Sequence, residues 1–235
     1  MNYSPKFETK NTNKIDFETG QILNFYKPVG KSSFYIVKVV RAVTGVKKVG
    51  HAGTLDPFAE GVLLVCTGKA TKQMSQLMDL RKEYVGVIRL GEIRDTDDIT
   101  GQIISTHDVP ELLPDRVRMV AKSFIGESEQ IPPMYSARRV NGQRLYKLAR
   151  KGVVVERKPR SIHIDEFDVL KIDLPFITIR VVCSKGTYIR VIARDFGNLL
   201  GCGAYLHSLS RTKIGEYSVN DALRIENFKQ WIESN

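Results

Sequence analysis

Apolar and polar positions repeat along the chain with two different periods. Residues 61–66 form a continuous apolar run, which is typical of a short strand buried on both faces. Residues 83–90 alternate between apolar and polar side chains, as a half-buried strand does. Residues 188–200 repeat their apolar side chains with helical spacing and stop before Gly201, a residue type that commonly ends helices. The pattern therefore predicts a chain of mixed strands and helices.

Weaker patterns complete the expected secondary structure. Further strands are predicted over residues 21–26, 162–172, 176–183 and 204–209, and further helices over residues 34–43, 71–80, 114–124 and 226–232. Ser32 or Ser33 can cap the first of these helices, and Pro114 suits the first turn of another. Because strands and helices do not alternate one for one, the pattern favours an α+β fold.

The chain shows no internal division. No repeat, low-complexity tract or Gly/Ser linker interrupts its 235 residues, so we expect a polar segment over residues 1–20 and one folded domain over residues 21–235. The polar segment lacks the apolar stretch of a secretory signal, and no apolar run approaches the roughly 20 residues of a membrane span. Cys66, Cys183 and Cys202 are odd in number and lie in apolar surroundings, which indicates reduced thiols and a cytoplasmic location.

The excess of basic residues suggests a kind of binding partner. The 36 lysines and arginines exceed the 26 acidic residues by 10, which fits a polyanionic partner and also a protein that is simply basic. No acidic residue occurs between Glu129 and Glu156, where Tyr135 and Tyr146 are interleaved with cations. These cations are Arg138, Arg139, Arg144, Lys147, Arg150 and Lys151. Cations for phosphates and rings for stacking predict an RNA-binding loop or hairpin, with a solvated basic face as the alternative.

The segment over residues 50–61 is the first candidate for chemistry. It is rich in glycine, contains His51 and Asp56, and precedes the buried strand. A residue before proline is biased towards extended backbone, which projects the Asp56 carboxylate from a loop held against a rigid strand. The alternative is a structural turn closed by Asp56, with His51 satisfying only a local hydrogen bond.

A second candidate lies over residues 183–190. A strand ends there, Gly186 makes a turn, and Arg190 falls in the first turn of the next helix. A cation at a helix N-terminus opposes the helix dipole, so Arg190 is expected to have an acidic partner, either a carboxylate or a phosphate. A surface arginine without a role is the alternative.

Metal chemistry has weaker support. Asp95, Asp97 and Asp98 cluster in a loop and could bind Mg²⁺, although a solvated turn is the preferred interpretation. The four histidines are His51, His107, His163 and His207, and their spacing is not that of metal ligands. We therefore expect neither a metal nor a cofactor.

Six ordered segments resemble the TruB family of tRNA pseudouridine synthases. They are residues 27–30 with 32–33, 50–57, 82–84, 131–137, 183–190 and 200–204, and together they span about residues 21–215. The resemblance implies the pseudouridine synthase fold, a mixed and largely antiparallel central sheet flanked by helices, with a basic insertion over about residues 132–152 that clamps the tRNA T-arm. It also implies isomerisation of the uridine at tRNA position 55, in the T loop.

The resemblance implies a role for each catalytic residue. Asp56 matches the catalytic aspartate and Arg190 the arginine paired with it. Tyr84 matches the tyrosine stacked on the target base, and its phenol can also move the proton at C5. The reaction breaks the N1–C1′ bond and rejoins the base through C5, so it consumes no cofactor.

Substrate-binding positions follow from the same resemblance. His51 matches the histidine that fills the gap left by the flipped uridine, Tyr188 a second tyrosine near the base, and Leu209 a leucine that contacts it. Lys27, in the first motif, is placed among the substrate-binding residues. We expect tRNA as the partner of a monomer, with no membrane and no obligate protein partner.

Two departures and two alternatives remain. Phe58 and Glu60 stand where the family more often has Leu and Thr, which we expect to tune local packing. The last twenty residues are too few for the C-terminal PUA domain of many members, so we expect none. The alternatives are an RNA-binding module that does not need Asp56, and a metal-dependent nuclease or phosphoesterase built on Asp95, Asp97 and Asp98.

Overall fold

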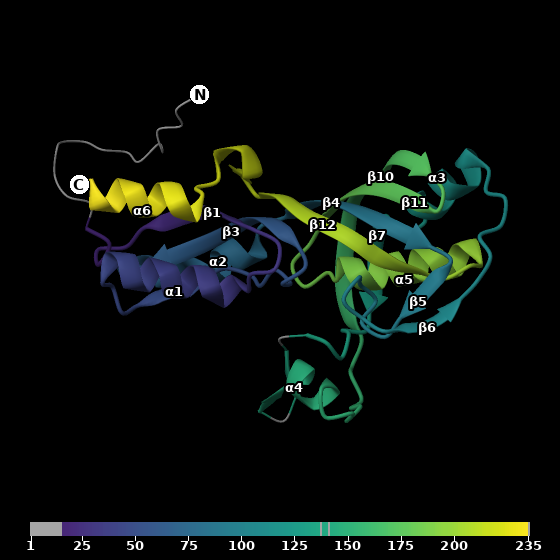
Figure 1. Cartoon of the computed structure of the whole chain (residues 1–235), viewed down its shortest axis with the longest axis horizontal. Helices are drawn as coiled ribbons and strands as arrows, with labels where there is room; N and C mark the ends of the chain where they lie inside the picture. Colours follow the sequence, from purple (N-terminus) through teal and green to yellow (C-terminus); the bar gives the residue numbers. More distant parts are fainter. Residues whose placement is uncertain (1–15, 137, 141, 235) are drawn as a thin grey trace. The chain divides into compact units, whose positions relative to one another are not determined.

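The computed structural model describes residues 16–136, 138–140 and 142–234, so most of the expected polar segment lies outside the described residues. The chain forms two compact units (Figure 1). Unit 1 comprises Met1–Leu80 and Ser210–Asn235, and unit 2 comprises Arg81–Leu209. Unit 2 is thus inserted into the sequence of unit 1, although no linker-like composition marks either boundary.

Unit 1 is built on a small sheet. Its elements are β1 (Ile22–Lys27), α1 (Ser33–Thr44), β2 (Val49–His51), β3 (Glu60–Thr67), the 3₁₀ helix η1 (Gly68–Gln73), α2 (Met74–Asp79), the end of β12 (Ala204–Ile214), β13 (Tyr217–Ser218), the 3₁₀ helix η2 (Val219–Asp221) and α6 (Ile225–Glu233). Strands β1 and β2 pair antiparallel with β3, while β12 runs parallel to β3 through Ser210 and Arg211.

The strand β3 is buried on both faces, as its apolar run predicts. Leu63 and Val65 face a core completed by α1 and α6, whereas Leu64 and Cys66 face a second core completed by η1 and α2. The predicted helix over residues 34–43 is confirmed as α1, where Ser32 is the N-cap and accepts a hydrogen bond from the Tyr35 amide.

Unit 2 carries a longer sheet in the order β12-β4-β11-β10-β7. Its elements are β4 (Lys82–Leu90), β5 (Glu92–Arg94), β6 (Ile103–Thr106), α3 (Pro114–Lys122), β7 (Gly126–Gln130), β8 (Arg139–Val140), β9 (Gln143–Arg144), α4 (Leu145–Ala149), β10 (Arg160–Asp173), β11 (Phe176–Cys183) and α5 (Ile189–Leu200). Strands β4, β11, β10 and β7 are joined antiparallel. Phe124, Phe167 and Phe196 pack their rings together beside α3, β10 and α5.

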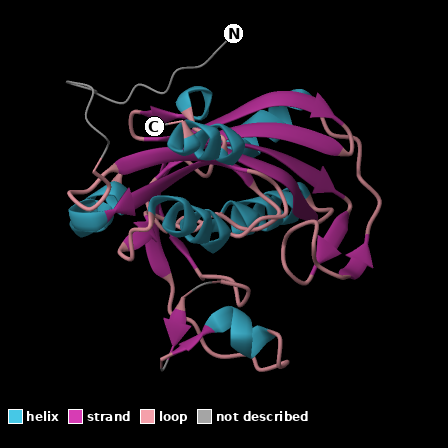
Figure 2. Ribbon diagram, turned by 60° about the vertical axis from the view of Figure 1, so that its left-hand side comes forward, coloured by secondary structure: helices cyan, strands magenta, loops and turns pink. Residues whose placement is uncertain are grey.

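The predicted α+β class is confirmed, with a mixed and largely antiparallel sheet beside helices (Figure 2). Two expectations differ in detail. The helix expected over residues 71–80 begins as the 3₁₀ helix η1, and the loop of Asp95, Asp97 and Asp98 lies between two strands that were not predicted, β5 and β6, which pair with each other. Strands of three and four residues are too short to show a recognisable alternation of apolar and polar side chains. No helix among the described residues is long and apolar enough to cross a membrane.

Candidate active site

The loop that carries Asp56 connects β2 and β3 in unit 1 and is held on both sides of the carboxylate. The Ser33 hydroxyl, at the start of α1, donates to the Leu55 carbonyl at 3.0 Å and accepts from the Leu55 amide at 2.9 Å. The Gly30 amide donates to the Pro57 carbonyl at 2.7 Å. The residues directly before and after Asp56 are therefore fixed by the segment that joins β1 to α1.

Lys27 supports the same loop from below the surface. Its side chain is fully buried, and Nζ donates to the carbonyls of Pro28 at 2.9 Å, Lys31 at 2.8 Å and Pro57 at 3.4 Å. Burial lowers the pKa of Lys27 to about 8, while the Asp56 carboxylate acts in the opposite direction. This geometry favours a loop-shaping role for Lys27 over direct contact with substrate.

Arg211 is a second buried cation, and no sequence pattern singled it out. It lies on β12 with 1% of its surface exposed, and its Nε donates to the Val62 carbonyl at 2.8 Å. Its terminal nitrogens donate to the carbonyls of Gly53 at 3.3 Å and Thr54 at 3.5 Å. Gly61 lets the strands approach here, because a Cβ at its φ of +108° would lie 2.3 Å from the Arg211 carbonyl oxygen.

His51 ends β2, opposite Val65 of β3. Burial lowers its pKa, and the positive charge of Arg211 lowers it further. Both effects favour the neutral form of the ring. A neutral imidazole can enter a stack of nucleobases without bringing a charge into it.

Glu60 does more than change packing. Its Oε2 accepts a hydrogen bond from the Tyr26 hydroxyl at 2.5 Å, which ties the first residue of β3 to β1. Burial, followed by this carboxylate, raises the pKa of Tyr26 to about 12. The Arg224 guanidinium lies 4.6 Å from the centre of the Tyr26 ring.

In unit 2, Arg190 lies in the first turn of α5 with 4% of its side chain exposed. Its guanidinium is 3.5 Å from the Asp98 carboxylate and donates to the carbonyls of Thr96 at 3.2 Å and Tyr135 at 3.0 Å. The expectation of an acidic partner is thus confirmed by Asp98. The pairing of Arg190 with Asp56 concerns residues of different units and stays a prediction.

The aspartate loop differs from the solvated turn that was expected. Asp98 is buried, and its Oδ1 accepts hydrogen bonds from Thr96 Oγ1 at 2.9 Å, the Thr100 amide at 2.9 Å and Thr100 Oγ1 at 2.5 Å. Asp97 lies 3.4 Å from Arg194. Across residues 16–136, 138–140 and 142–234, no group of three His, Cys, Asp or Glu side chains could hold a metal ion. Asp98 accepts hydrogen bonds within the loop and pairs with Arg190, and Asp97 pairs with Arg194.

The remaining base-contact candidates of unit 2 lie on neighbouring elements. Tyr84 is on β4, opposite Val181 of β11. Leu209 is on β12, close enough to β4 that a Cβ at Gly86 would lie 3.3 Å from it. Tyr188 precedes α5, and its amide donates to Gln130 Oε1 at 2.8 Å while Gln130 Nε2 donates to its carbonyl at 3.1 Å.

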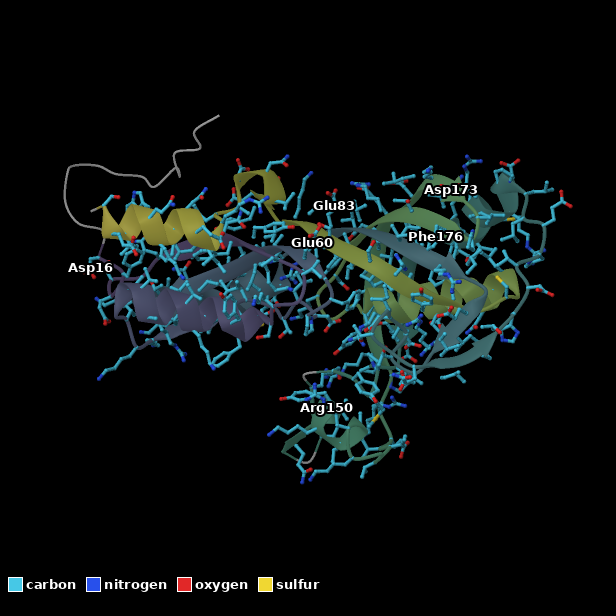
Figure 3. All side chains as sticks on the ribbon, in the orientation of Figure 1. Asp16, Glu60, Glu83, Arg150, Asp173 and Phe176 are labelled. Atoms are coloured by element: carbon cyan, nitrogen blue, oxygen red, sulfur yellow. The ribbon has the colours of Figure 1, made fainter. Side chains whose placement is uncertain are left out.

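The predicted basic hairpin is present between β7 and β10. Strands β8 and β9 pair so that Arg139 lies opposite Arg144, and α4 follows (Figures 1 and 2). The Arg150 guanidinium lies 5.6 Å from the centre of the Tyr146 ring, and Figure 3 labels Arg150 in this segment. Lys147, Arg150 and Lys151 are exposed, whereas Arg138 is half-buried.

The sequence of the chain matches a known protein family. Residues 41–189 match the model described as TruB family pseudouridylate synthase, N-terminal domain. The chain belongs to the TruB family. It is 44% identical to the tRNA pseudouridine synthase B of Phocaeicola vulgatus over 93% of this chain and 96% of that protein. Its identity to the tRNA pseudouridine synthase B of Clostridium tetani is 45%, over 89% of this chain and 72% of that protein.

Solved structures agree with the TruB assignment. A Cbf5-Nop10-Gar1 complex contains a chain that is 28% identical, with a TM-score of 0.72 over 93% of this chain and 57% of that chain. An H/ACA RNP bound to a substrate RNA containing 2′-deoxyuridine gives 26% identity and a TM-score of 0.67, over 93% and 56%. This TruB-family chain thus spans little more than half of either solved chain.

The structure of this TruB-family protein gathers the expected site residues within each unit. Unit 1 holds Asp56 and His51 in a loop fixed by Lys27, and unit 2 holds Arg190 beside Tyr188 at the start of α5. Arg211 is an addition that sequence patterns did not single out, and Asp98, considered from the sequence only as a metal ligand, is the partner of Arg190.

Proposed function

We propose that this TruB-family protein converts uridine to pseudouridine at position 55, in the T loop of tRNA. The observation that carries the proposal is the rigid Asp56 loop, in which Ser33 and Gly30 fix both neighbours of the carboxylate within a chain of this family. A preorganised reactive group needs no rearrangement when substrate arrives. The relatives named tRNA pseudouridine synthase B support tRNA as the substrate.

Asp56 is proposed to act in its ionised form. The buried ammonium of Lys27 and the Asp56 carboxylate attract each other, and this attraction raises the pKa of Lys27 against the effect of its burial. Arg190 would add a second positive charge. Three routes start from this carboxylate: attack on C1′, attack on C6, or removal of the 2′ proton to give a glycal-like intermediate. Each ends with the base turned and rejoined through C5.

The target base has to leave its stack before it can react, and the remaining residues suit this step. Tyr84 offers a ring on which the extruded base can stack, with Tyr188 and Leu209 as further contacts. His51 fills the vacated space with a neutral ring, as its lowered pKa favours.

The basic insertion is proposed to hold the T-arm backbone. Its cations are Arg138, Arg139, Arg144, Lys147, Arg150 and Lys151. Each phosphate contact adds salt-sensitive affinity. We infer an enzyme that acts as a monomer without a metal or cofactor. We also infer that it works in the cytoplasm, a compartment in which its three buried cysteines stay reduced.

Tritium release from [5-³H]uridine-labelled RNA tests this function. Wild type and Asp56→Asn are compared on full-length tRNA and on a T-arm stem-loop, with EDTA present throughout. Release by wild type alone is expected, and an uncut, isomerised product excludes the nuclease alternative. Release on tRNA but not on the stem-loop would show that contacts beyond the T-arm are required. Absence of release on both RNAs would favour an RNA-binding module instead.

A further inference from the structure

A second basic surface, separate from the insertion, lies on unit 1. No aspartate or glutamate occurs between Glu18 and Asp56. The cations of this stretch are Lys27, Lys31, Lys38, Arg41, Lys47 and Lys48. All except the buried Lys27 are exposed. This run of 37 residues without an acid, between Glu18 and Asp56, concentrates positive charge on one part of the molecule.

Three of these cations and Phe34 follow one another along α1 and the residues just before it, and we call them the α1 stripe: Lys31, Phe34, Lys38 and Arg41. The spacing of Phe34, Lys38 and Arg41 places these three on one side of the helix, which is about 18 Å long, away from the side that enters the core; Lys31 directly precedes the N-cap. Figure 3 shows side chains ending in nitrogen along α1.

The stripe is ordered around an exposed ring. Phe34 is 49% exposed, and the Lys38 ammonium and Arg41 guanidinium lie 5.5 Å and 5.8 Å from its ring centre. Arg41 also donates to the Val49 carbonyl at 2.7 Å, and the Lys31 ammonium lies 5.0 Å from the Tyr35 ring centre. Cation–π contacts limit the motion of these long side chains and so reduce the entropy lost when they bind.

The charge of the stripe is not balanced within the protein. In the described part of the chain, no ion pair joins Lys31, Lys38 or Arg41 to a carboxylate. Lys171, an exposed cation of unit 2, differs in this respect because its ammonium lies 2.8 Å from the Asp173 carboxylate. An unbalanced basic stripe around an exposed aromatic ring fits a partner that offers both phosphates and flat rings or sugars.

We infer that the α1 stripe binds the substrate RNA beyond the reacting nucleotide, with Lys31, Lys38 and Arg41 at phosphates and Phe34 against a base or ribose. This inference rests on the proposed function only in taking RNA as the substrate. Its place in unit 1 supports it, because Ser33 at the start of α1 fastens the residue before Asp56. An RNA strand held at the loop can therefore continue along the helix.

Charge-matched variants test the stripe. Lys31→Gln with Lys38→Gln is compared with Lys171→Gln with Lys229→Gln, since both double variants lower the net charge by two. Lys171 has its Asp173 partner, and Lys229 is exposed on α6, a helix that also carries Glu226 and Glu233. The Kd for unmodified full-length tRNA is measured at about 50, 100 and 200 mM salt. The stripe variant should bind about tenfold more weakly at 100 mM and lose about 2 from the salt slope, whereas the control stays within about twofold.

The aromatic ring is tested separately. Phe34→Leu should weaken binding several-fold and Phe34→Tyr should bind like wild type, because tyrosine keeps the ring face.

The inference is overturned if the stripe variants bind RNA as tightly as the control pair, a result that would favour a protein partner for α1. Pseudouridine formation is assayed on the same preparations. Stripe-dependent binding without product by wild type would refute the proposed function alone, and product without stripe dependence would refute the stripe alone.

Discussion

The two units bury an arginine beside a candidate catalytic element in opposite ways. In unit 1, Arg211 donates only to backbone carbonyls in the contacts described above, and Lys27 does the same. In unit 2, Arg190 faces the buried carboxylate of Asp98. Carbonyl dipoles solvate a cation without cancelling its charge, whereas a carboxylate neutralises it and fixes its direction. Unit 1 therefore keeps a positive field around its loop, and unit 2 keeps one guanidinium in a set orientation.

The difference suits what each element carries. The half-buried Asp56 carboxylate lies within the attraction of Lys27, whose charge is solvated by carbonyls and not cancelled by an ion pair. Arg190 needs a defined direction, which the fork of a guanidinium gains from several fixed acceptors. Removing a buried cation should therefore damage the loop in unit 1, and removing a buried carboxylate should release an arginine in unit 2.

The largest effect is expected for Arg211→Met. The change leaves the buried Val62 carbonyl without this donor, at roughly 1–3 kcal/mol, removes two longer bonds to the less buried carbonyls of Gly53 and Thr54, and loses the packing of the guanidinium. We expect the free energy of unfolding to fall by at least about 3 kcal/mol in urea titrations, and pseudouridine formation to fall more than about a hundredfold. Arg211→Lys, which keeps the charge but not the fork, should lie between. Unfolding of Arg211→Met at the wild-type urea concentration would show that these bonds do not hold the loop.

The next effect separates the two tasks of Tyr84. Tyr84→Phe keeps the ring for stacking and loses only the phenol. If the phenol moves the C5 proton, kcat falls about a hundredfold while tRNA affinity is unchanged. Tyr84→Leu serves as the comparison, because it should also weaken RNA binding. Turnover by Tyr84→Phe at the wild-type rate would leave stacking as its whole role.

Sequence patterns predicted strands that are buried on both faces and helices whose apolar side chains repeat regularly. The run over residues 61–66 could be interpreted because β3 is buried on both faces, and α5 because its apolar stripe faces one core. Asp56 and Arg190 stood out through the proline and glycine turns around them. Arg211 and the burial of Asp98 could not be predicted, because burying a charge depends on partners supplied by distant segments. Val62 lies 149 residues before Arg211 in sequence.

A smaller effect is expected when the carboxylate of unit 2 loses its charge. Asp98→Asn keeps an amide oxygen for Thr96 and Thr100 but turns a neutral NH₂ group towards Arg190. The loop should remain folded while the guanidinium loses its counter-charge, and we expect kcat to fall about tenfold, or about 1.4 kcal/mol. Asp95→Asn, at an exposed position of the same loop, is the matched control. Equal rates for both variants would mean that the orientation of Arg190 does not depend on Asp98.

The smallest effect concerns Asp97, and it appears only as pH changes. Burial raises the pKa of Asp97 to about 6, from an ordinary value of 3.8, against the attraction of Arg194. Between these two values the folded chain holds a proton that the unfolded chain has lost. The stabilisation from Asp97 is therefore complete below pH 3.8 and is lost as pH rises through 6.

Asp97→Asn removes this titration and keeps a residue type that tolerates its φ of 60°. The free energy of unfolding of Asp97→Asn, relative to wild type, should therefore increase from about pH 4 to pH 7 by up to about 2 kcal/mol. Thermal unfolding of both proteins across this range measures the change. Parallel pH profiles would mean that Asp97 ionises in the folded unit as easily as in the unfolded chain, and that the arginines beside it offset the effect of burial.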